Sequence, residues 1–309
     1  GGAGPGGAPS GRLQGVEQEG EKTMGKIVIV GSGPAGCSAA LYAARAGQEV
    51  VVISMGMGAL SKAELIQNYY GFEEGITGAE LYRQGVAGAK AVGAEFITAE
   101  VVGLDYTGSL VVQTTEGDYP ADAVILATGA GRIAPKIAGL AEHEGRGVSY
   151  CATCDAFFYR GKMAAVLGSG EYALHEVQAL LPLAGKVILC TNGEPLTADF
   201  PEGVEICTEK LAAVEGEEKV SALRLENGEL LPVEGLFVAL GVAGSAALAR
   251  KLGAPVENGR IVVDERMQTG IPGLYAAGDC TGGLLQVCKA VYEGALAATE
   301  AIKQIRGKK

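Results

Sequence analysis

Residues Lys26–Ser54 read KIVIVGSGPAGCSAALYAARAGQEVVVIS. The stretch opens with a short run of β-branched residues, passes through a glycine-rich turn and an alanine-rich segment, and closes with a second β-branched run. Short β-branched runs are typical of buried strands, and the alanine-rich segment between them is long enough for a helix. This order of strand, turn, helix and strand predicts a βαβ unit whose two strands are parallel neighbours in one sheet.

The same pattern occurs a second time along the chain. Lys162–Thr191 reads KMAAVLGSGEYALHEVQALLPLAGKVILCT, with a Gly-Ser-Gly turn in the equivalent place. An internal repeat of this kind predicts an α/β protein with two Rossmann-like, three-layer domains. A chain of 309 residues is long enough for two domains of ordinary size.

The order of the segments predicts that the second domain is inserted into the first. Apolar segments that end in Gly or Gly-Asp, at 124–129 and 273–279, fit strands of the first domain and lie on either side of the second unit. The expected boundaries are residues 24–135 and 246–309 for the first domain, 136–245 for the second, 133–139 and 241–245 for the hinges, and 1–23 for a disordered extension without any apolar run.

Composition and charge narrow the class of protein. The chain carries 25 basic and 36 acidic side chains, a formal net charge of −11. Nucleic acids and anionic membranes bind clustered Lys and Arg, so neither is expected as a partner. No apolar run reaches the roughly 18 residues that a membrane-spanning helix needs. Seven cysteines in so long a chain do not suggest a secreted disulfide scaffold, and we expect the protein in the reducing cytoplasm.

The turn of the first unit has the residues that a dinucleotide pyrophosphate requires. Gly31 permits the tight turn, Gly33 lets the backbone approach the phosphates, and Gly36 allows the helix to pack closely on the strand. Pro34 and Ala35 begin the helix, whose first N–H groups face the phosphates with the favourable end of the helix dipole. A glycine-rich turn that merely joins a strand to a helix is the alternative, and the flanking strand and helix favour dinucleotide binding.

A second segment favours FAD as that dinucleotide. Residues 273–279 (GLYAAGD) form an apolar run that ends in Gly278-Asp279. A carboxylate after a strand-end glycine can accept hydrogen bonds from ribityl hydroxyls beside the pyrophosphate. The run VILATG ends in Gly129, which we expect at the same edge of the sheet. Taken alone, each of these segments would be interpreted as an ordinary strand-end turn.

A Cys-x-x-Cys pair, Cys151 and Cys154, lies just before the second unit and is followed by Asp155. As metal ligands the pair would need two further Cys or His at matching spacing, but the remaining ones are scattered, so no metal site is expected. Two inert core thiols followed by an acid would be a coincidence. We favour a redox dithiol, in which the sulfurs close a small disulfide ring and one of them becomes an attacking thiolate.

These motifs together resemble the low-molecular-weight thioredoxin reductases, and the resemblance extends over Met24–Lys309. The matching segments are GSGPAG at Gly31–Gly36, CATCDAFFYRGK at Cys151–Lys162 and GIPGLYAAGD at Gly270–Asp279, in the same order along the chain. The resemblance implies a two-domain FAD protein, usually a homodimer, that reduces thioredoxin. Residues 24–135 and 246–309 would then be the FAD-binding domain.

The resemblance also implies roles for individual residues. Cys154 would contact the flavin, Cys151 would attack the disulfide of thioredoxin, and Asp155 would donate and accept protons for the thiolates. Asn68 matches an Asn beside the flavin, and Gln286, which is followed by Val287, matches a Gln near its pyrimidine edge.

The chain departs from the family at two flavin contacts and throughout the nucleotide site of the second unit. Ser54 stands where an acid usually holds the ribose hydroxyls, and Leu285 where an Arg is usual. NADPH recognition needs a basic cluster after the second strand of the second unit, but no Lys or Arg occurs from 187 to 208. Glu194 would repel a 2′-phosphate, and Tyr172 puts a bulky ring on the expected cofactor path. The second unit therefore predicts a degenerate pyridine-nucleotide domain.

This combination is similar to the ferredoxin-dependent flavin thioredoxin reductases, with which the chain shares GEYALHE at Gly170–Glu176 and NYYGFEE at Asn68–Glu74. In that branch, reduced ferredoxin supplies electrons one at a time. Ferredoxins are usually acidic, so a chain with a net charge of −11 would need a local basic patch. The candidates for that patch are Lys62, Arg132, Lys136, Arg160 and Lys162.

Three alternatives to a ferredoxin-fed reductase stay open on the sequence alone. An NADPH-dependent thioredoxin reductase would hold the 2′-phosphate by atypical contacts. A flavin dithiol oxidase would pass electrons from a small dithiol to oxygen. A flavin redox sensor would use the Cys pair only to switch conformation, although such a protein has no need of the acid at Asp155.

Overall fold

The structure is a computed structural model, and it describes residues 24–130 and 136–307. Its first sheet contains five parallel strands in the order β18-β7-β1-β2-β3. The bounds are β1 (Lys26–Val30), β2 (Glu49–Ser54), β3 (Glu95–Thr98), β7 (Ala123–Leu126) and β18 (Leu274–Ala276). The strand–turn–helix–strand unit predicted from residues 26–54 is present as β1, α1 (Pro34–Arg45) and β2, with the two strands parallel neighbours.

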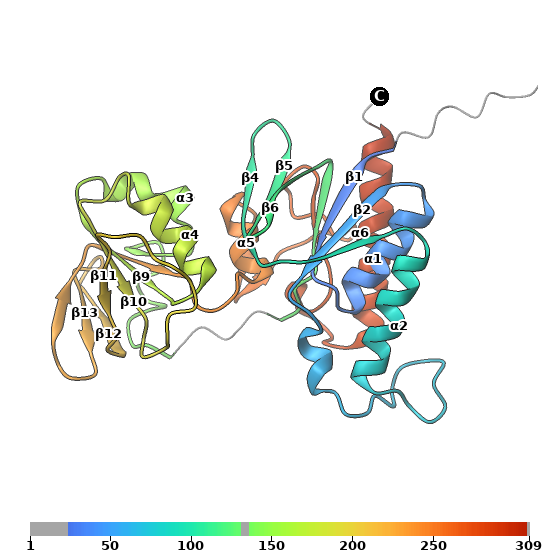
Figure 1. Ribbon diagram of the computed structural model, residues 1–309, viewed down its shortest axis with the longest axis horizontal. Coiled ribbons are helices and arrows are strands. Elements are labelled where there is room, and N and C mark those ends of the chain that lie inside the picture. The colour runs from blue at the N-terminus through green and yellow to red at the C-terminus, as the bar shows by residue number, and fades with distance from the viewer. Residues whose placement is uncertain (1–23, 131–135, 308–309) are drawn as a thin grey trace, which may run out of the picture.

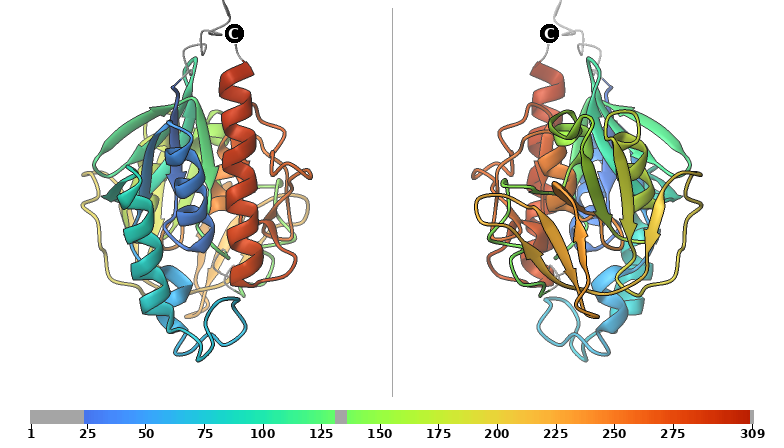
Figure 2. Two further views of the ribbon diagram at one scale, coloured as in Figure 1. Left: turned by 90° about the vertical axis from the view of Figure 1, so that its right-hand side faces the viewer. Right: turned by 90° about the vertical axis from the view of Figure 1, so that its left-hand side faces the viewer.

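Side chains alternate across this sheet and give it two packed faces. Ile27 and Ile29 of β1 belong to a buried cluster with α1 and α6 (Val287–Gly307), whereas Val28 and Val30 point the other way. Figure 2 shows α1, α6 and α2 (Gly78–Ala91) side by side over the first face. The second face is covered by an antiparallel sheet of β4 (Val101–Tyr106), β5 (Leu110–Thr114) and β6 (Gly117–Ala121).

The second parallel sheet lies at the other end of the molecule in Figure 1, with the strand order β11-β10-β9-β15-β8. The bounds are β8 (Val148–Ser149), β9 (Met163–Leu167), β10 (Lys186–Cys190), β11 (Glu205–Cys207) and β15 (Gly235–Val238). The helix α4 (Glu171–Leu180) packs on one face. The antiparallel strands β12 (Leu211–Glu215), β13 (Ala222–Leu225) and β14 (Leu230–Pro232) pack on the other. The second unit of the internal repeat is thus β9, α4 and β10.

Because the first sheet takes strands from both ends of the chain, the second Rossmann-like unit is inserted into the first, as the sequence predicts. The return crossing ends at α5 (Ser245–Lys251), which packs on β4 and on β17 (Arg260–Ile261), the partner of β16 (Val256–Glu257). Ser245 donates its N–H to Thr128 Oγ1 at 2.8 Å, and Thr128 follows β7 directly. The outgoing and returning segments are therefore joined at the edge of the first sheet.

Two of the predicted features fall partly or wholly outside the described residues. The extension 1–23 lies outside them, and so do residues 131–135, which include Arg132 and part of the first hinge. The numerical domain boundaries therefore stay predictions. The longest described helix, α6, has 21 residues and carries charged side chains along its length, one of which, Glu293, is buried. Over the described ranges, no helix combines the length and apolarity that a bilayer crossing requires.

Candidate functional site

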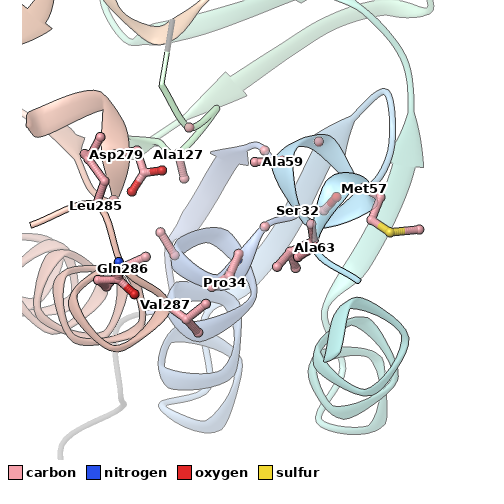
Figure 3. A pocket seen from close by; sticks show the side chains of 18 of the residues that line it. Ser32, Pro34, Met57, Ala59, Ala63, Ala127, Asp279, Leu285, Gln286 and Val287 are labelled. Atoms are coloured by element: carbon pink, nitrogen blue, oxygen red, sulfur yellow. The ribbon is translucent and has the colours of Figure 1, made fainter. Parts of the chain in front are cut away.

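A cleft opens at the carboxyl ends of the strands of the first sheet, and Figure 3 shows its lining. Its cavity volume is about 310 Å³. The site residues expected from the sequence that line it are Gly31, Gly33, Pro34, Ala35, Asn68, Gly129, Gly278, Asp279, Gln286 and Val287. Ligands of open α/β sheets bind at this edge of the sheet. The cleft is therefore built from segments that are distant in the sequence.

The glycine turn after β1 has the geometry that a phosphate cradle needs. Gly31 has φ +109°, and a Cβ there would lie 2.3 Å from the carbonyl oxygen of Ala127. Gly36 does not line the cleft, but a Cβ on it would meet the Gly31 carbonyl oxygen at 1.8 Å. A Cβ on Gly33 would meet no protein atom within 4 Å, because this position faces the open cleft. The backbone at Gly33 can therefore approach a pyrophosphate closely.

Ser54, expected near the nucleotide ribose, is placed differently from the other residues. Its hydroxyl lies 2.7 Å from Ser32 Oγ, and Ser54 is absent from the lining of the cleft. Ser32 itself lines the cleft, is 2% exposed and also contacts Tyr82 Oη at 3.1 Å. A direct contact of Ser54 with the ribose stays a prediction. In the structure its hydroxyl is hydrogen-bonded to that of Ser32.

The residues expected around the flavin come together across the whole length of the chain. Asn68 Nδ2 donates a hydrogen bond to Gln286 Oε1 at 2.9 Å, although 218 positions separate the two residues. Both side chains line the cleft, and so does Leu285, which replaces the Arg usual in the family. The pair fixes the start of α6 against the segment that follows the 3₁₀ turn η1 (Gly58–Lys62).

Two α6 residues that the sequence analysis did not single out bind the Gly278-Asp279 loop, which lines the cleft. Glu293 Oε2 accepts the N–H of Gly278 at 2.8 Å and lies 3.0 Å from Lys289 Nζ. Lys289 Nζ in turn donates to the carbonyl oxygen of Gly278 at 2.8 Å and to Thr281 Oγ1 at 2.8 Å. The acid–base pair therefore fixes the loop that presents Asp279, in the 3₁₀ turn η3 (Asp279–Thr281).

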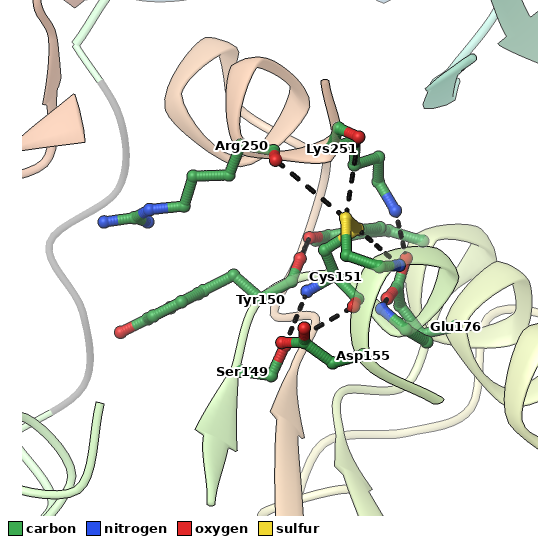
Figure 4. The surroundings of a disulfide bond; sticks show 10 residues. Ser149, Tyr150, Cys151, Asp155, Glu176, Arg250 and Lys251 are labelled. Atoms are coloured by element: carbon green, nitrogen blue, oxygen red, sulfur yellow. Dashed lines mark hydrogen bonds and ion pairs between the residues drawn. A yellow bond between two sulfur atoms is a disulfide. The ribbon is translucent and has the colours of Figure 1, made fainter. Parts of the chain in front are cut away.

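Cys151 and Cys154 form a disulfide at the start of α3 (Ala152–Asp155), with their Cα atoms 5.3 Å apart. Cys151 is 4% exposed, whereas Cys154 is exposed and its Sγ lies 3.5 Å from the carbonyl oxygen of Lys251. The N–H of Cys154 donates to Cys151 Sγ at 3.1 Å. Figure 4 shows the disulfide facing the end of α5, and neither sulfur-bearing residue lines the flavin-type cleft.

Asp155 is linked to Cys151 through a serine. Ser149 Oγ donates to Asp155 Oδ2 at 2.7 Å, and the N–H of Cys151 donates to Ser149 Oγ at 3.1 Å. Asp155 also lines a second cavity of about 560 Å³, on the side of α3 that continues into the 3₁₀ turn η2 (Ala156–Tyr159). Burial, together with the charges of Asp155 and Glu234, raises the pKa of Tyr159 in that cavity. The Asp155 carboxyl group is therefore linked to the disulfide through Ser149 and also lines the second cavity.

A buried ion pair connects α4 to α5 directly behind the disulfide. Glu176 Oε1 bonds to Lys251 Nζ, and each side chain is 1% exposed. Glu176 Oε2 accepts the N–H of Ala152, the residue between Cys151 and Thr153. One carboxylate therefore contacts both the disulfide loop and the α5 lysine whose carbonyl oxygen faces Cys154 (Figure 4). Sequence reasoning missed this pair, because Glu176 and Lys251 are 75 positions apart and share no motif.

Tyr172 lies buried in the first turn of α4. Its ring is 3% exposed, and its hydroxyl donates to the carbonyl oxygen of Tyr150 at 3.1 Å. The ammonium of Lys251 lies 5.6 Å from the ring centroid, and burial raises the pKa of the tyrosine. The Arg250 guanidinium stacks over Tyr150, 4.5 Å from its ring centroid. The tyrosine thus fills space at the turn and helps to hold the disulfide loop.

The loop that follows β10 contacts the glycine turn of the second unit. The N–H of Thr197 donates to the carbonyl oxygen of Ser169 at 2.9 Å, and Thr197 Oγ1 would lie 3.0 Å from a Cβ on Gly170. Thr191, at the end of β10, is 1% exposed and its hydroxyl has no hydrogen-bond partner. The loop that follows β10 therefore lies against the turn that would hold the pyrophosphate of a pyridine nucleotide.

Metal ligands do not gather in the part of the chain that the structure describes: no group of three or more His, Cys, Asp or Glu side chains there could hold an ion. The chemistry supported by the described residues is that of the disulfide, its neighbouring acid and the dinucleotide cleft.

Comparison with known proteins gives consistent matches over nearly the whole chain. The family model for pyridine nucleotide-disulphide oxidoreductases matches residues 25–294. A thioredoxin reductase of Aquifex aeolicus is 36% identical over 307 residues, which is 92% of this chain and 94% of that protein. The crystal structure of the atypical thioredoxin reductase TRi of Desulfovibrio vulgaris Hildenborough has a TM-score of 0.86 and 40% identity, covering 92% of this chain and 98% of that one.

A third relative is the ferredoxin-flavin thioredoxin reductase of Clostridium acetobutylicum, whose 1.3 Å crystal structure matches with a TM-score of 0.70 and 35% identity over 92% of this chain and 99% of that one. The matched segments include the glycine turn of β1, the disulfide and the Gly278-Asp279 loop. The cleft, with its open backbone at Gly33, fits the FAD of these flavoproteins. The chain therefore belongs to the low-molecular-weight thioredoxin reductases, FAD-binding members of the pyridine nucleotide-disulphide oxidoreductase family.

Proposed function

We propose that this protein reduces the disulfide of thioredoxin through Cys151 and Cys154, with electrons that enter from reduced ferredoxin rather than from NADPH. Bound FAD supplies the conversion between single electrons and electron pairs. The proposal includes a homodimer in a reducing cytoplasm, as expected from the family resemblance and from the cysteine usage. In this proposal, side chains of the protein itself perform the thiol–disulfide exchange and the proton transfer.

The two sulfurs have different surroundings, which supports different roles. Cys151 Sγ accepts the N–H of Cys154 at 3.1 Å, and this hydrogen bond would stabilise a thiolate on Cys151 after reduction. We assign to Cys151 the attack on thioredoxin and to Cys154 the exchange with the flavin. Because Cys151 is 4% exposed, thioredoxin can reach it only after α3 separates from α5. The arrangement in Figure 4 is thus the closed one.

Asp155 is the proton carrier in this proposal. Its Oδ2 is joined through Ser149 Oγ to the backbone of Cys151, and its other side faces a cavity of about 560 Å³. A carboxyl group so placed can give a proton to the leaving thiolate of thioredoxin and exchange it with solvent through the cavity.

The observation that carries the choice of donor is the contact between Thr197 and Ser169. The loop after β10 donates a backbone N–H to the glycine turn of the second unit, where a pyridine nucleotide would place its phosphates. Glu171 and Asp199 line a shallow cavity beside this loop, and neither attracts a 2′-phosphate. Similarity to a ferredoxin-flavin thioredoxin reductase over 92% of the chain supports the same donor.

The test is a thioredoxin-coupled insulin reduction assay with the FAD-loaded enzyme under argon. Reduced ferredoxin should support steady turnover, whereas NADPH and NADH at millimolar concentration should leave the rate at the background without enzyme. A Cys151→Ser variant serves as the control for direct chemical reduction and should be inactive with every donor. Turnover with NADPH at the ferredoxin rate would overturn the choice of donor and leave the disulfide chemistry standing.

A further inference from the structure

Cys190 and Cys207 lie opposite each other in the second sheet, far along the chain from the catalytic disulfide. They are in-register partners of the parallel strands β10 and β11. The N–H of Thr191 donates to the carbonyl oxygen of Cys207 at 2.9 Å, which fixes this register just past the pair. Neighbouring strands place paired Cα atoms about 4.8 Å apart, inside the range of roughly 4.4–6.8 Å that a disulfide spans. Both cysteines are free thiols in the structure.

The two thiols project from the same face of the sheet and differ in exposure. Cys190 is fully buried in the cluster that β12 and β13 cover, and Cys207 packs at the margin of that cluster. Because β11 is the edge strand, Cys207 is half-buried and open to solvent on one side. The pair thus has an accessible member and a sheltered one. This is the arrangement of a reactive cysteine beside a resolving cysteine.

The electrostatic surroundings favour the thiolate on the accessible member. A hydrogen bond from the Cys190 thiol lowers the pKa of Cys207 to about 6, assisted by the backbone N–H of Glu209. Partial burial of Cys207 and the charges of Glu209 and Glu229 oppose this shift of its pKa. Glu205, which also faces the pair, is bound to Lys186. The same contact, followed by burial, raises the pKa of Cys190, which stays a neutral thiol.

We propose that Cys207 and Cys190 form a second, peroxide-reactive dithiol that nothing in the reductase chemistry uses. In the first step the Cys207 thiolate attacks a hydroperoxide: its sulfur gains one oxygen and becomes a sulfenic acid, and the peroxide leaves as water or an alcohol after protonation. In the second step the Cys190 thiol attacks that sulfur, an S–S bond forms, and one water leaves. Two thiols are oxidised by two electrons in total, and one peroxide is reduced.

The choice of a neutral hydroperoxide follows from the charges around the pair. Glu209 and Glu229 would repel an anionic disulfide such as oxidised glutathione, whereas an uncharged peroxide meets no such barrier. The site also lies on the side of the sheet away from α4, and its residues are absent from the flavin-type cleft. Its reaction is therefore separable from flavin reduction.

The sequence around the pair makes a direct mass measurement possible. No Lys or Arg occurs between Lys186 and Lys210, so trypsin releases both cysteines in one peptide, 187–210. The FAD-loaded protein, first reduced and then exposed to one equivalent of hydrogen peroxide at pH 7, should yield this peptide two hydrogens lighter and resistant to alkylation. The rate should exceed that of the exposed Cys288 by about tenfold, because the lowered pKa of Cys207 makes the thiolate its main form at pH 7.

Variants separate the two steps. Cys190→Ala should stop at the sulfenic acid, which dimedone traps on Cys207, and Cys207→Ser should leave Cys190 unreacted. The rate of Cys207 oxidation should fall as the pH drops below about 6, where the thiolate is protonated. Equal oxidation rates at Cys207 and Cys288, or no disulfide within peptide 187–210 in the wild-type protein, would overturn the proposal. Cys288→Ser is the matched control and should change neither outcome.

Discussion

Glu176 and Lys251 form an ion pair in which each side chain is 1% exposed. This pair joins α4 to α5, the two helices on either side of the disulfide. The same carboxylate binds the N–H of Ala152 inside the disulfide loop. A charge buried in this way is stable only while its partner stays in place. The closed arrangement of α3 on α5 therefore includes a buried ion pair between the two Rossmann-like units, beside the ring contacts of Arg250 with Tyr150 and of Lys251 with Tyr172.

Breaking this pair from one side should be costly. Glu176→Gln leaves the Lys251 ammonium buried without a counter-charge, and we expect a loss of about 3–5 kcal/mol in the free energy of unfolding. The measurement is denaturant unfolding of the FAD-loaded protein. Glu205→Gln, which breaks the exposed pair with Lys186, is the control and should cost less than about 1 kcal/mol. Equal losses in the two variants would contradict the role of the buried pair.

The double variant Glu176→Gln/Lys251→Met separates stability from closure. It removes both charges, so much of the lost stability should return, yet the electrostatic contact between α4 and α5 stays absent. After reduction, Cys151 should then be alkylated several-fold faster than in the wild-type protein, because α3 leaves α5 more often. An unchanged alkylation rate would contradict this role of the ion pair and show that apolar packing alone keeps the Cys151 thiol covered.

Gly33 and Gly36 offer a matched test of the dinucleotide cleft. A Cβ at Gly33 meets no protein atom within 4 Å, so Gly33→Ala should fold normally but crowd the pyrophosphate. Overpacking of about 1–3 kcal/mol corresponds to FAD binding weakened by about 5- to 150-fold. Gly36→Ala would place its methyl 1.8 Å from the Gly31 carbonyl oxygen and should instead disrupt the fold. Flavin absorbance and circular dichroism distinguish the two results, and full FAD occupancy in Gly33→Ala at submicromolar flavin would contradict this assignment.

Asp155→Asn should slow thioredoxin reduction by roughly 10²–10⁴-fold, the usual effect of losing a positioned proton-transfer group. The flavin should still bind, since Asp155 does not line the cleft. Glu234→Gln is the control, because Glu234 lines the same cavity as Asp155 but accepts its hydrogen bond from the N–H of Met163, outside the disulfide loop. A variant Asp155→Asn that retained more than half of the wild-type rate would remove this residue from the mechanism.

The segments that line the cleft could be predicted from the sequence because their geometry depends on local backbone chemistry. Gly31 has a positive φ in a tight turn and Gly36 packs on a strand, and both requirements can be inferred from the order of neighbouring residues. The disulfide is equally local, since three positions separate Cys151 from Cys154. Parallel pairing then brings Gly278 and Asp279 to the same edge of the sheet as the glycine turn.

The contacts that sequence reasoning missed are those that depend on the packing of distant helices. Nothing in the spacing of Glu176 and Lys251 indicates that both are buried at one point. Lys289 and Glu293 have the spacing of an ordinary exposed helical pair, yet they hold the Gly278 loop. The ribose contact of Ser54 stays a prediction, and the spacing of Ser32 and Ser54 gives no sign that their hydroxyls lie 2.7 Å apart.

The most direct test of the account is the first half of the reaction, observed without thioredoxin. Oxidised, FAD-loaded protein is mixed anaerobically with reduced ferredoxin, with NADPH or with NADH, and the flavin absorbance is followed in a stopped-flow instrument. NADPH should bind weakly because the chain lacks basic side chains for its 2′-phosphate. Losing two such charge-assisted hydrogen bonds, worth about 1.5–3 kcal/mol each, would weaken NADPH binding by about a hundredfold to several ten-thousandfold. We predict rapid bleaching with ferredoxin and none within minutes with either nucleotide. Rapid bleaching by NADPH would contradict the central claim.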